Sequence, residues 1–154
     1  MIQVVREQKG SISVYKLSGN ISEDTHFDDV MGPSNPEMEI NCKGILRINS
    51  MGVKTWIKYF QTCQKSGTKL NFSECSTAIV EQINLISNFT CGGTVESIYL
   101  PFSCLSCKTE LSGLFKTEDL KKMKMSLPTL KCTKCSGKAE FDDIPEDYLA
   151  FLGK

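Results

Sequence analysis

The sequence predicts a mixed α/β fold, in which helices cover a sheet, followed by a small cysteine-rich segment. Over residues 1–100, short β-type runs alternate with amphipathic segments at helical spacing. Strands separated by helices need crossover connections, which give a parallel or mostly parallel sheet. After residue 100 the pattern changes to paired cysteines, lysines and an acidic tail. We therefore expect an α/β domain over residues 1–100 and a separate segment over residues 101–154.

The length and composition are those of an ordinary water-soluble protein. The chain has 154 residues, of which 40% are hydrophobic and 23% are charged, enough for one core and a small appendage. Its 18 Lys and Arg residues balance 18 Asp and Glu residues, so the net charge indicates no polyanionic partner. Polar residues interrupt the apolar stretches, and we expect no membrane span. The N-terminus lacks the basic and apolar regions of a signal peptide, and we expect a cytoplasmic protein.

The first strands are predicted at Ile2–Arg6 and Ser11–Leu17, joined by a turn at Gln8–Gly10. Because the two runs are close in the sequence, we expect an antiparallel hairpin at one edge of the sheet. A third strand is predicted at Gly44–Ile48, a compact apolar run typical of buried strands.

A short helix is predicted between the second and third strands. Ser22 is a candidate N-cap, and the helix must end before Gly32, which precedes a proline. The apolar residues at helical spacing are Phe27, Val30 and Met31.

The longest predicted helix follows the turn Asn49–Gly52 and ends near Gly67. A strand at Thr68–Phe72, a helix that Ser76 can cap and a last strand at Thr94–Leu100 complete the α/β domain. The predicted order is β-β-α-β-α-β-α-β. The apolar face of the long helix consists of Val53, Trp56, Ile57, Phe60 and Cys63.

Two Cys-x-x-Cys pairs, Cys104 with Cys107 and Cys132 with Cys135, are separated by 24 residues. Each tight pair can direct two sulfurs at one ion, and the intervening segment can fold back to unite the pairs. Four thiolates in a tetrahedron are a ligand set of structural zinc sites, so the spacing predicts a zinc ribbon with a structural Zn²⁺. Iron, or reduced or redox-active thiols without a metal, are the alternatives. Backbone amides and nearby lysines can offset the charge of the cluster; these lysines are Lys108, Lys131 and Lys134.

The remaining cysteines and the single histidine, His26, give little support for an enzyme. The isolated cysteines lie on an apolar helix face or beside element ends, which is typical of small buried thiols. His26 is expected on the surface of the short helix, and no nucleophile and base are identifiable as a pair. We therefore expect no catalytic site. The isolated cysteines are Cys42, Cys63, Cys75 and Cys91.

The turn at residues 49–52 follows a predicted strand and opens the long helix. Unpaired amides at a helix N-terminus can hold an anion, so Asn49, Ser50 and Gly52 are candidate contacts for a partner or an anion. The simpler interpretation is a helix cap, in which Asn49 or Ser50 accepts a hydrogen bond from the first turn. No Walker-type lysine or two-glycine phosphate loop is present.

Residues 1–100 resemble a STAS domain, the family of anti-sigma-factor antagonists and of cytoplasmic domains of sulfate transporters. The resemblance lies in the order of elements and in three segments, Leu17–Ser22, Ile45–Val53 and Leu70–Thr77. It covers about two thirds of the chain. The usual final helix of the family is not evident after Leu100, and we expect the tail Ile144–Leu152 to cover the surface left open.

The turn departs from the family pattern, which usually reads Asp-Ser-Ser/Thr-Gly. In antagonists of this family the hydroxyl residue before the glycine is phosphorylated by a partner kinase. Here Met51 holds that position and Asn49 replaces the acidic residue. The resemblance thus implies an interaction surface without the usual phosphoswitch, and the phosphorylation site is not transferred to Ser50.

The sequence predicts a noncatalytic protein-interaction module in bacterial signalling or regulation, with a structural zinc site. The alternative is a zinc-ribbon protein that binds nucleic acid, because lysines outnumber acidic residues over residues 116–138. Residues 115–138 contain no arginine and one aromatic residue, Phe115, so base recognition and stacking have little support. The lysines are Lys116, Lys121, Lys122, Lys124, Lys131, Lys134 and Lys138.

Overall fold

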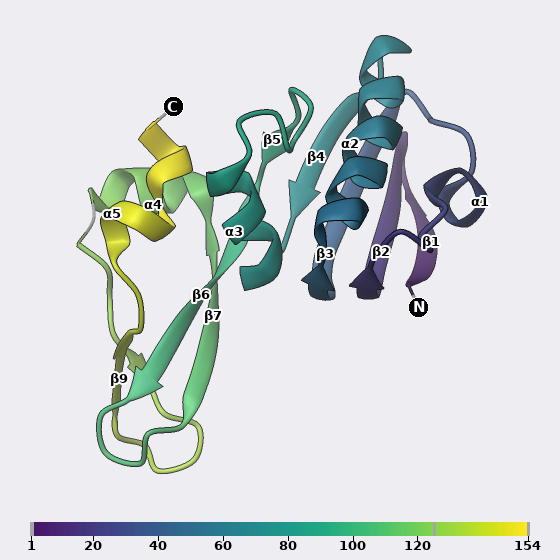
Figure 1. The fold of residues 1–154 in the computed structure, drawn as a ribbon. Helices are drawn as coiled ribbons and strands as arrows, with labels where there is room; N and C mark the ends of the chain where they lie inside the picture. The colour runs from purple at the N-terminus through teal and green to yellow at the C-terminus, as the bar shows by residue number, and fades with distance from the viewer. Residues whose placement is uncertain (1, 125, 154) are drawn as a thin grey trace.

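The computed structural model describes residues 2–124 and 126–153 and contains two sheets that meet along one strand (Figure 1). The first sheet has the order β1-β2-β3-β4-β5 and the second has the order β7-β6-β9-β8. The elements of the first part are β1 (Gln3–Lys9), β2 (Ile12–Ile21), α1 (Phe27–Met31), β3 (Glu37–Ile48), α2 (Ser50–Lys65), β4 (Lys69–Ser73), α3 (Thr77–Leu85) and β5 (Thr94–Val95). The remainder are β6 (Ser97–Cys104), β7 (Glu110–Lys116), α4 (Thr117–Met123), β8 (Leu130–Lys131), β9 (Lys138–Phe141), α5 (Pro145–Tyr148) and the 3₁₀ helix η1 (Ala150–Gly153).

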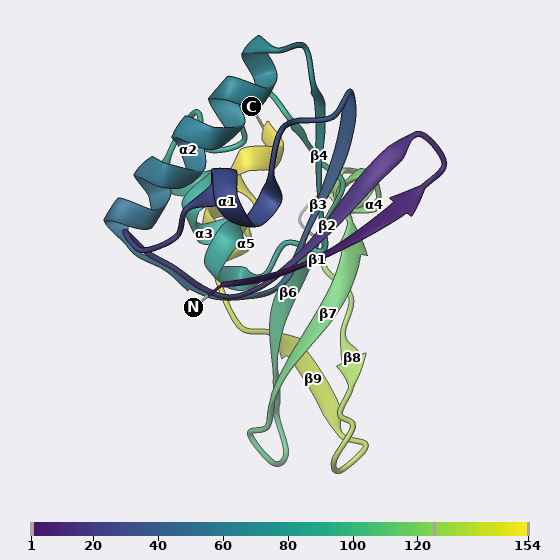
Figure 2. The same cartoon turned by 90° about the vertical axis from the view of Figure 1, so that its right-hand side faces the viewer.

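The first sheet is mixed, as predicted. β1 and β2 form an antiparallel hairpin at one edge, and the β2–β3, β3–β4 and β4–β5 pairs are parallel. Gly10, in the hairpin turn, has φ 63°, a conformation that costs glycine little. Figure 2 shows α1, α2 and α3 on the same side of the sheet. The predicted order of strands and helices and the sheet covered by helices are confirmed.

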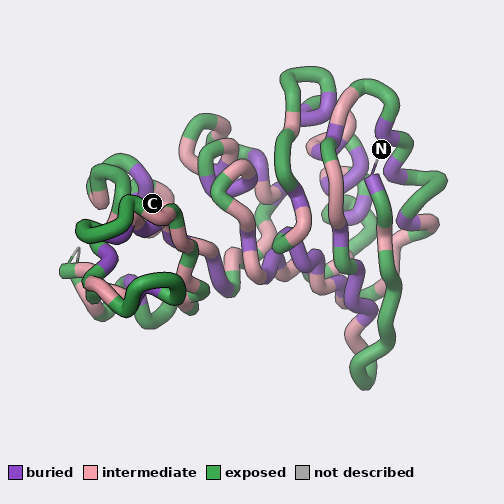
Figure 3. The backbone as a smooth tube through the Cα atoms, turned by 90° about the horizontal axis from the view of Figure 1, so that it is seen from below, coloured by how far each residue is buried: buried purple, intermediate pink, exposed green. Residues whose placement is uncertain are grey.

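The main core lies between α2 and the covered face of the first sheet, where buried residues recur along the strands (Figure 3). Trp56 is fully buried at its centre, with ring centroids 4.7 Å from Phe60 and 4.8 Å from Phe89. Its indole Nε1 donates a hydrogen bond of 2.9 Å to the carbonyl oxygen of Phe89, so its polar atom is satisfied inside the core. This aromatic cluster anchors α2 and the loop after α3 to the sheet.

Strand β3 is longer than the sequence indicated. It begins at Glu37, and its buried part is centred on Met38, Ile40 and Cys42. Leu46, within the apolar run predicted as buried, is 71% exposed. The prediction failed because β3 alternates apolar and polar residues over its first half, the pattern of a strand buried on one face.

The cap of the short helix α1 also differs from the prediction. The N-cap is His26, whose side chain makes no capping bond, and Val30 is exposed rather than part of the apolar side. The Ser22 hydroxyl accepts a hydrogen bond from the amide of Asp24. Ser22 therefore stabilises the turn that precedes the helix, and not the helix itself.

The predicted last strand forms two elements that belong to different sheets. Residues 94–95 pair with β4 as β5, and the chain then continues as β6. The amide of Cys75 donates to the carbonyl of Ser97 at 3.0 Å, and the amide of Tyr99 donates to the carbonyl of Cys75 at 2.9 Å. β6 runs through Pro101 to Cys104 and carries the second sheet away from the first (Figure 1). The expected domain boundary near residue 100 thus falls inside a strand.

The C-terminal tail, Ile144–Leu152, packs back on α3. The Asn84 side chain donates 2.8 Å to the carbonyl of Tyr148 and accepts 3.0 Å from the amide of Phe151. Tyr148 and Leu149 are buried, and the Tyr148 hydroxyl donates to the carbonyl of Tyr99. The tail therefore joins the second sheet to the helical layer of the first.

Among the described residues, the structure contains no helix with both the length and the apolar character to cross a membrane.

We predict that Asn84→Ala releases the tail from α3. The substitution removes a donor and an acceptor to two backbone groups, so the free energy of unfolding should fall by about 1–3 kcal/mol. Urea unfolding measures this change, and limited proteolysis should cut the tail of the variant first. The control is Asn88→Ala, at an exposed site, which should change stability by less than about 0.5 kcal/mol. Equal stability of the two variants would contradict the assigned role of Asn84.

Candidate functional site

The four paired cysteines meet at the end of the second sheet. Cys104 is the last residue of β6 and Cys107 lies in the turn before β7, whereas Cys132 and Cys135 lie between β8 and β9. Their Sγ atoms all lie within 4.8 Å of one another, with Cys104 to Cys135 at 3.4 Å and Cys107 to Cys132 at 3.6 Å. A tetrahedron with bonds of about 2.3 Å to zinc has edges of about 3.8 Å. The cluster could therefore hold a metal ion.

The two cysteine turns share the same backbone hydrogen bonds and the same backbone conformation. The Cys104 amide donates 2.9 Å to the Thr109 carbonyl, and the Cys132 amide donates 2.8 Å to the Gly137 carbonyl. The residue after each second cysteine, Lys108 or Ser136, has positive φ, at 62° and 63°. Each of these two residues also donates its amide, at 3.0 Å, to the carbonyl of the first cysteine of its pair. The repeated geometry directs two sulfurs from each turn toward one point.

Backbone amides and a hydroxyl stabilise negative charge on the sulfurs. The amide of Cys107 donates to Cys104 Sγ and lowers the pKa of the Cys104 thiol. Thr109 Oγ1 lies 3.0 Å from Cys107 Sγ, and its hydrogen bond, with that of its amide, lowers the pKa of Cys107 to about 6. The amide of Lys134 donates to Cys132 Sγ at 3.4 Å. These donors favour the thiolate form that binds metals.

The pKa of the fourth thiol, Cys135, is raised rather than lowered. The amide of Gly137 acts to lower the pKa of Cys135, but contacts with the thiols of Cys104 and Cys107 outweigh it and raise the pKa to about 12. Ionisation of Cys135 is thus disfavoured by the neighbouring thiols, and a cation between the sulfurs would favour its thiolate form. A Cβ atom at Gly137 would lie 3.1 Å from Cys135 Sγ, so glycine lets the backbone pass close to the cluster.

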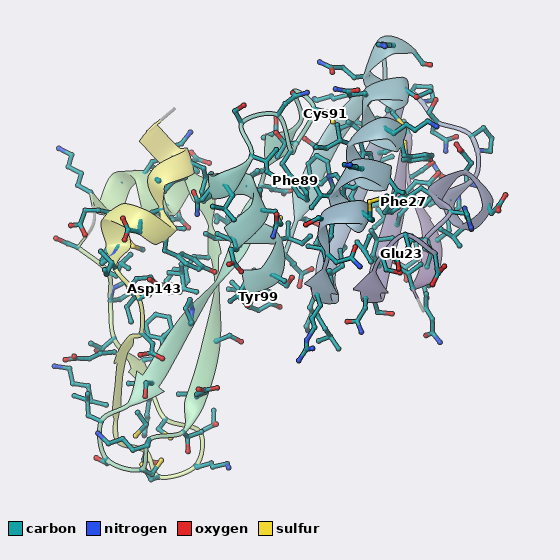
Figure 4. The ribbon with its side chains drawn as sticks, in the orientation of Figure 1. Glu23, Phe27, Phe89, Cys91, Tyr99 and Asp143 are labelled. Atoms are coloured by element: carbon teal, nitrogen blue, oxygen red, sulfur yellow. The ribbon has the colours of Figure 1, made fainter. Side chains whose placement is uncertain are left out.

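The lysines expected to offset the charge of the cluster have exposed side chains. These are Lys108, Lys131 and Lys134. Within residues 2–124 and 126–153, none of their ammonium groups hydrogen-bonds to a cysteine sulfur. In Figure 4 the sulfurs of the cluster lie at the end of the second sheet that is farthest from α3. Backbone amides, rather than lysines, supply the direct contacts to sulfur.

The turn before α2 is a closed helix cap. Asn49 Oδ1 accepts 2.7 Å from the amide of Gly52, and Asn49 Nδ2 donates 3.0 Å to Glu23 Oε2. Hydrogen bonds from its own backbone amide and from Asn49 lower the pKa of Glu23, which is labelled in Figure 4. A Cβ at Gly52 would lie 2.5 Å from the carbonyl oxygen of Ile21. A carboxylate beside the turn disfavours an anion, whereas Ser50 and Met51 remain exposed for contact with a partner.

The other residues considered from the sequence form no reactive group. The isolated cysteines are buried, and burial raises the pKa of Cys42 and raises that of Cys91 to about 11. The raised pKa values of Cys42 and Cys91 favour their protonated form, as expected for inert buried cysteines. His26 is exposed at the start of α1. No cysteine, serine and histidine come together among the described residues as a nucleophile and its base.

One surface feature was missed by the sequence reasoning, a hollow of about 600 Å³ between α3 and the tail. Leu46 and Leu85, each 71% exposed, line it together with acidic residues of the tail. The acidic tail was visible in the sequence. Its position beside two exposed leucines was not, because Leu46 was predicted to be buried.

Comparisons with known proteins give limited information. The chain matches no protein-family model, and no curated protein matches its sequence. One similar solved structure is the crystal structure of an anti-sigma factor antagonist from Mycobacterium paratuberculosis. The two are 20% identical, the match covers 56% of this chain and 79% of that chain, and the TM-score is 0.45. At this level of similarity the comparison assigns neither a family nor a function.

Proposed function

We propose that the chain is a noncatalytic protein-interaction module of the STAS type, used in bacterial signalling or regulation. The observation that carries this proposal is the turn at the start of α2, where Met51 is 48% exposed on a backbone fixed by the Asn49 cap. An apolar side chain presented on a rigid turn suits recognition of a protein surface. Residues 1–100 supply this surface, and the second sheet with its two cysteine turns forms an arm that extends from it.

The arm is proposed to be a zinc ribbon. Cys104, Cys107, Cys132 and Cys135 would be the ligands, and Zn²⁺ would neutralise thiolates that otherwise oppose one another. The fit rests on the separations of the sulfurs, on the amide donors and on the repeated turns. Four protein ligands leave no position for water or substrate, so the metal would be structural. The buried, protonated thiols and the exposed His26 likewise supply no catalytic group.

Nucleic-acid binding is the less favoured alternative. The lysines of residues 116–138 fall into two groups, one on and beside α4 and one on the arm around Cys132 and Cys135. β7 joins α4 to the first cysteine turn, and its seven residues span about 20 Å. The lysines therefore do not make one continuous basic surface at the end of the arm.

We predict that Met51→Asp abolishes capture of a protein partner from a lysate of the source organism. A buried carboxylate at the contact costs binding energy, so recovery of the partner should fall by about tenfold or more. Leu114→Asp is the matched control, because Leu114 is also 48% exposed but lies on β7. Quantitative mass spectrometry measures the partner, and the same data report phosphate on Ser50, which we expect to be absent. A partner retained equally by both variants, or stoichiometric phosphate on Ser50 that changes binding, contradicts the proposed surface.

We predict a single zinc ion per chain, measured by elemental analysis of protein never exposed to a chelator. Cys132→Ser should lose most of the metal, because three thiolates and a hydroxyl bind zinc less tightly. Alkylation with iodoacetamide followed by mass spectrometry should modify the arm cysteines only after chelation. Cys63→Ser is the control and should keep its zinc, since Cys63 lies on the buried face of α2, in the α/β part of the chain. Metal-free native protein, or full zinc content in Cys132→Ser, would overturn the ligand set.

We predict only weak, nonspecific binding of RNA or DNA at physiological salt. Reversing Lys121, Lys122 and Lys124 to glutamate should change this binding little, measured by fluorescence anisotropy over a range of salt concentrations. The control is the reversal of Lys54 and Lys58, two exposed lysines of α2. Tight binding that is lost in the α4 variant but kept in the α2 variant, with unchanged zinc content, would favour the nucleic-acid alternative.

A further inference from the structure

A groove lies between α3 and the C-terminal tail, and both apolar and acidic residues line it. Its main hollow has a volume of about 600 Å³. A smaller hollow of about 320 Å³ adjoins it and shares Leu46, Ala78 and Glu81. We call these two hollows the tail groove. Its walls come mainly from β3, from α3 and from the tail residues before and within α5, three segments that are far apart in the sequence, and Pro101 of β6 also lines it.

The apolar part of the tail groove is unusually exposed. Leu46 and Leu85 are each 71% exposed, the largest values among the large hydrophobic residues of the described chain. Both line the same hollow, together with Pro101. Single exposed leucines are common on protein surfaces, but exposed leucines gathered in one concave site indicate an interaction surface.

The rim of the main hollow is acidic. Glu81, Asp142, Asp143 and Asp147 line it, and no lysine or arginine among the described residues does so. None of these four carboxylates forms an ion pair within residues 2–124 and 126–153. Arg47 lies at the far end, in the smaller hollow. The groove therefore presents unneutralised negative charge around apolar contacts.

We propose that the tail groove binds a basic amphipathic segment of a partner protein, in helical form. The leucines would contact the apolar face of the partner segment, and the carboxylates would contact lysine or arginine side chains along its edges. This inference rests on the proposed function as a protein-interaction module and assigns a second contact surface to it, separate from Met51. It also assigns a role to the acidic tail.

Two other occupants fit the groove less well. A metal ion would use the carboxylates but would leave Leu46 and Leu85 uncovered. A second copy of this chain would offer the lysines of α4, but the apolar side of that helix is already used, since Leu120 is buried against its own chain. The partner segment must bring an apolar face of its own, and this favours a different protein.

The test uses the full chain and two fluorescent peptides of about 15 residues that form amphipathic helices. One has leucines along one face and lysines elsewhere, and the other has glutamates in place of the lysines. We expect the Leu/Lys peptide to bind at physiological salt in the micromolar range and the Leu/Glu peptide to bind about tenfold or more weakly. Fluorescence anisotropy measures both. No binding of the Leu/Lys peptide, or equal binding of the two peptides, overturns the proposal.

Two double variants in the groove and one control double variant outside it test where the peptide binds. Leu46→Ser with Leu85→Ser should weaken Leu/Lys binding by about tenfold or more, whereas Val5→Ser with Leu114→Ser, which also replaces two exposed apolar residues, should leave it unchanged. Glu81→Lys with Asp142→Lys should remove most of the preference between the peptides, because the two lysines balance the remaining Asp143 and Asp147. Circular dichroism verifies that each variant is folded. Unchanged peptide affinity in the folded Leu46/Leu85 variant places the peptide elsewhere and overturns the proposal.

Self-association is tested with the same variants. Light scattering should give the mass of a monomer at the concentrations of the peptide assay, because the groove is expected to receive a different protein. A dimer that the Leu46/Leu85 substitutions dissociate would identify a second copy as the occupant and overturn the proposal. The Met51 capture experiment reports separately on the proposed function. If Met51→Asp loses the partner and the peptide also fails to bind, the proposed interaction module is supported. The proposed binding site in the tail groove is then overturned.

Discussion

The backbone pairing of Cys75 with β6 fixes where the second sheet leaves the first. Cys75 donates to Ser97 and accepts from Tyr99, so the start of β6 extends the α/β sheet next to the end of β4. Three residues farther along, β6 pairs with β9 from Phe102 to Cys104. Because β6 also forms a bridge to Cys75 beyond the end of β4, the direction of the arm follows from the register of β6 and not from a flexible linker. The arm is thus a continuation of the α/β sheet.

The tail uses the same strand as its support. The amide of Asp142 donates 2.9 Å to the carbonyl of Pro101, and the Tyr148 hydroxyl donates to the carbonyl of Tyr99. The tail then reaches α3 through Asn84. β6 therefore contacts both the arm, through its pairing with β9, and the tail, through the carbonyl groups of Tyr99 and Pro101. The tail thus reaches α3 only after the chain has passed through the second sheet.

The sequence predicted the elements that depend on local patterns. The cap at Asn49, the apolar stripe of α2 and the spacing of the cysteine pairs each reflect a rule that acts over a few residues. Prediction from the sequence failed where contacts between distant segments determine the structure. The first half of β3 was missed because its polar residues lie on the face of the sheet opposite α2, and Leu46 lines a hollow whose other residues come from distant segments. The tail groove could not be predicted, since its walls come from three separate parts of the chain.

The geometry connects the cysteine cluster to the tail groove. β9 begins three residues after Cys135 and ends at Phe141, directly before Asp142, which lines the groove. β9 is a short strand held by β6 and β8, and a short strand of this kind has little stability apart from the cysteine turns that frame it. The position of Asp142 therefore depends on the pairing of β9 in the arm, whereas Glu81 lies on α3 and Asp147 lies in the part of the tail that Asn84 holds. A change at the cysteines would reach the groove through a single strand, whereas the turn at Met51, held by the Asn49 cap and the Trp56 core, would not be disturbed.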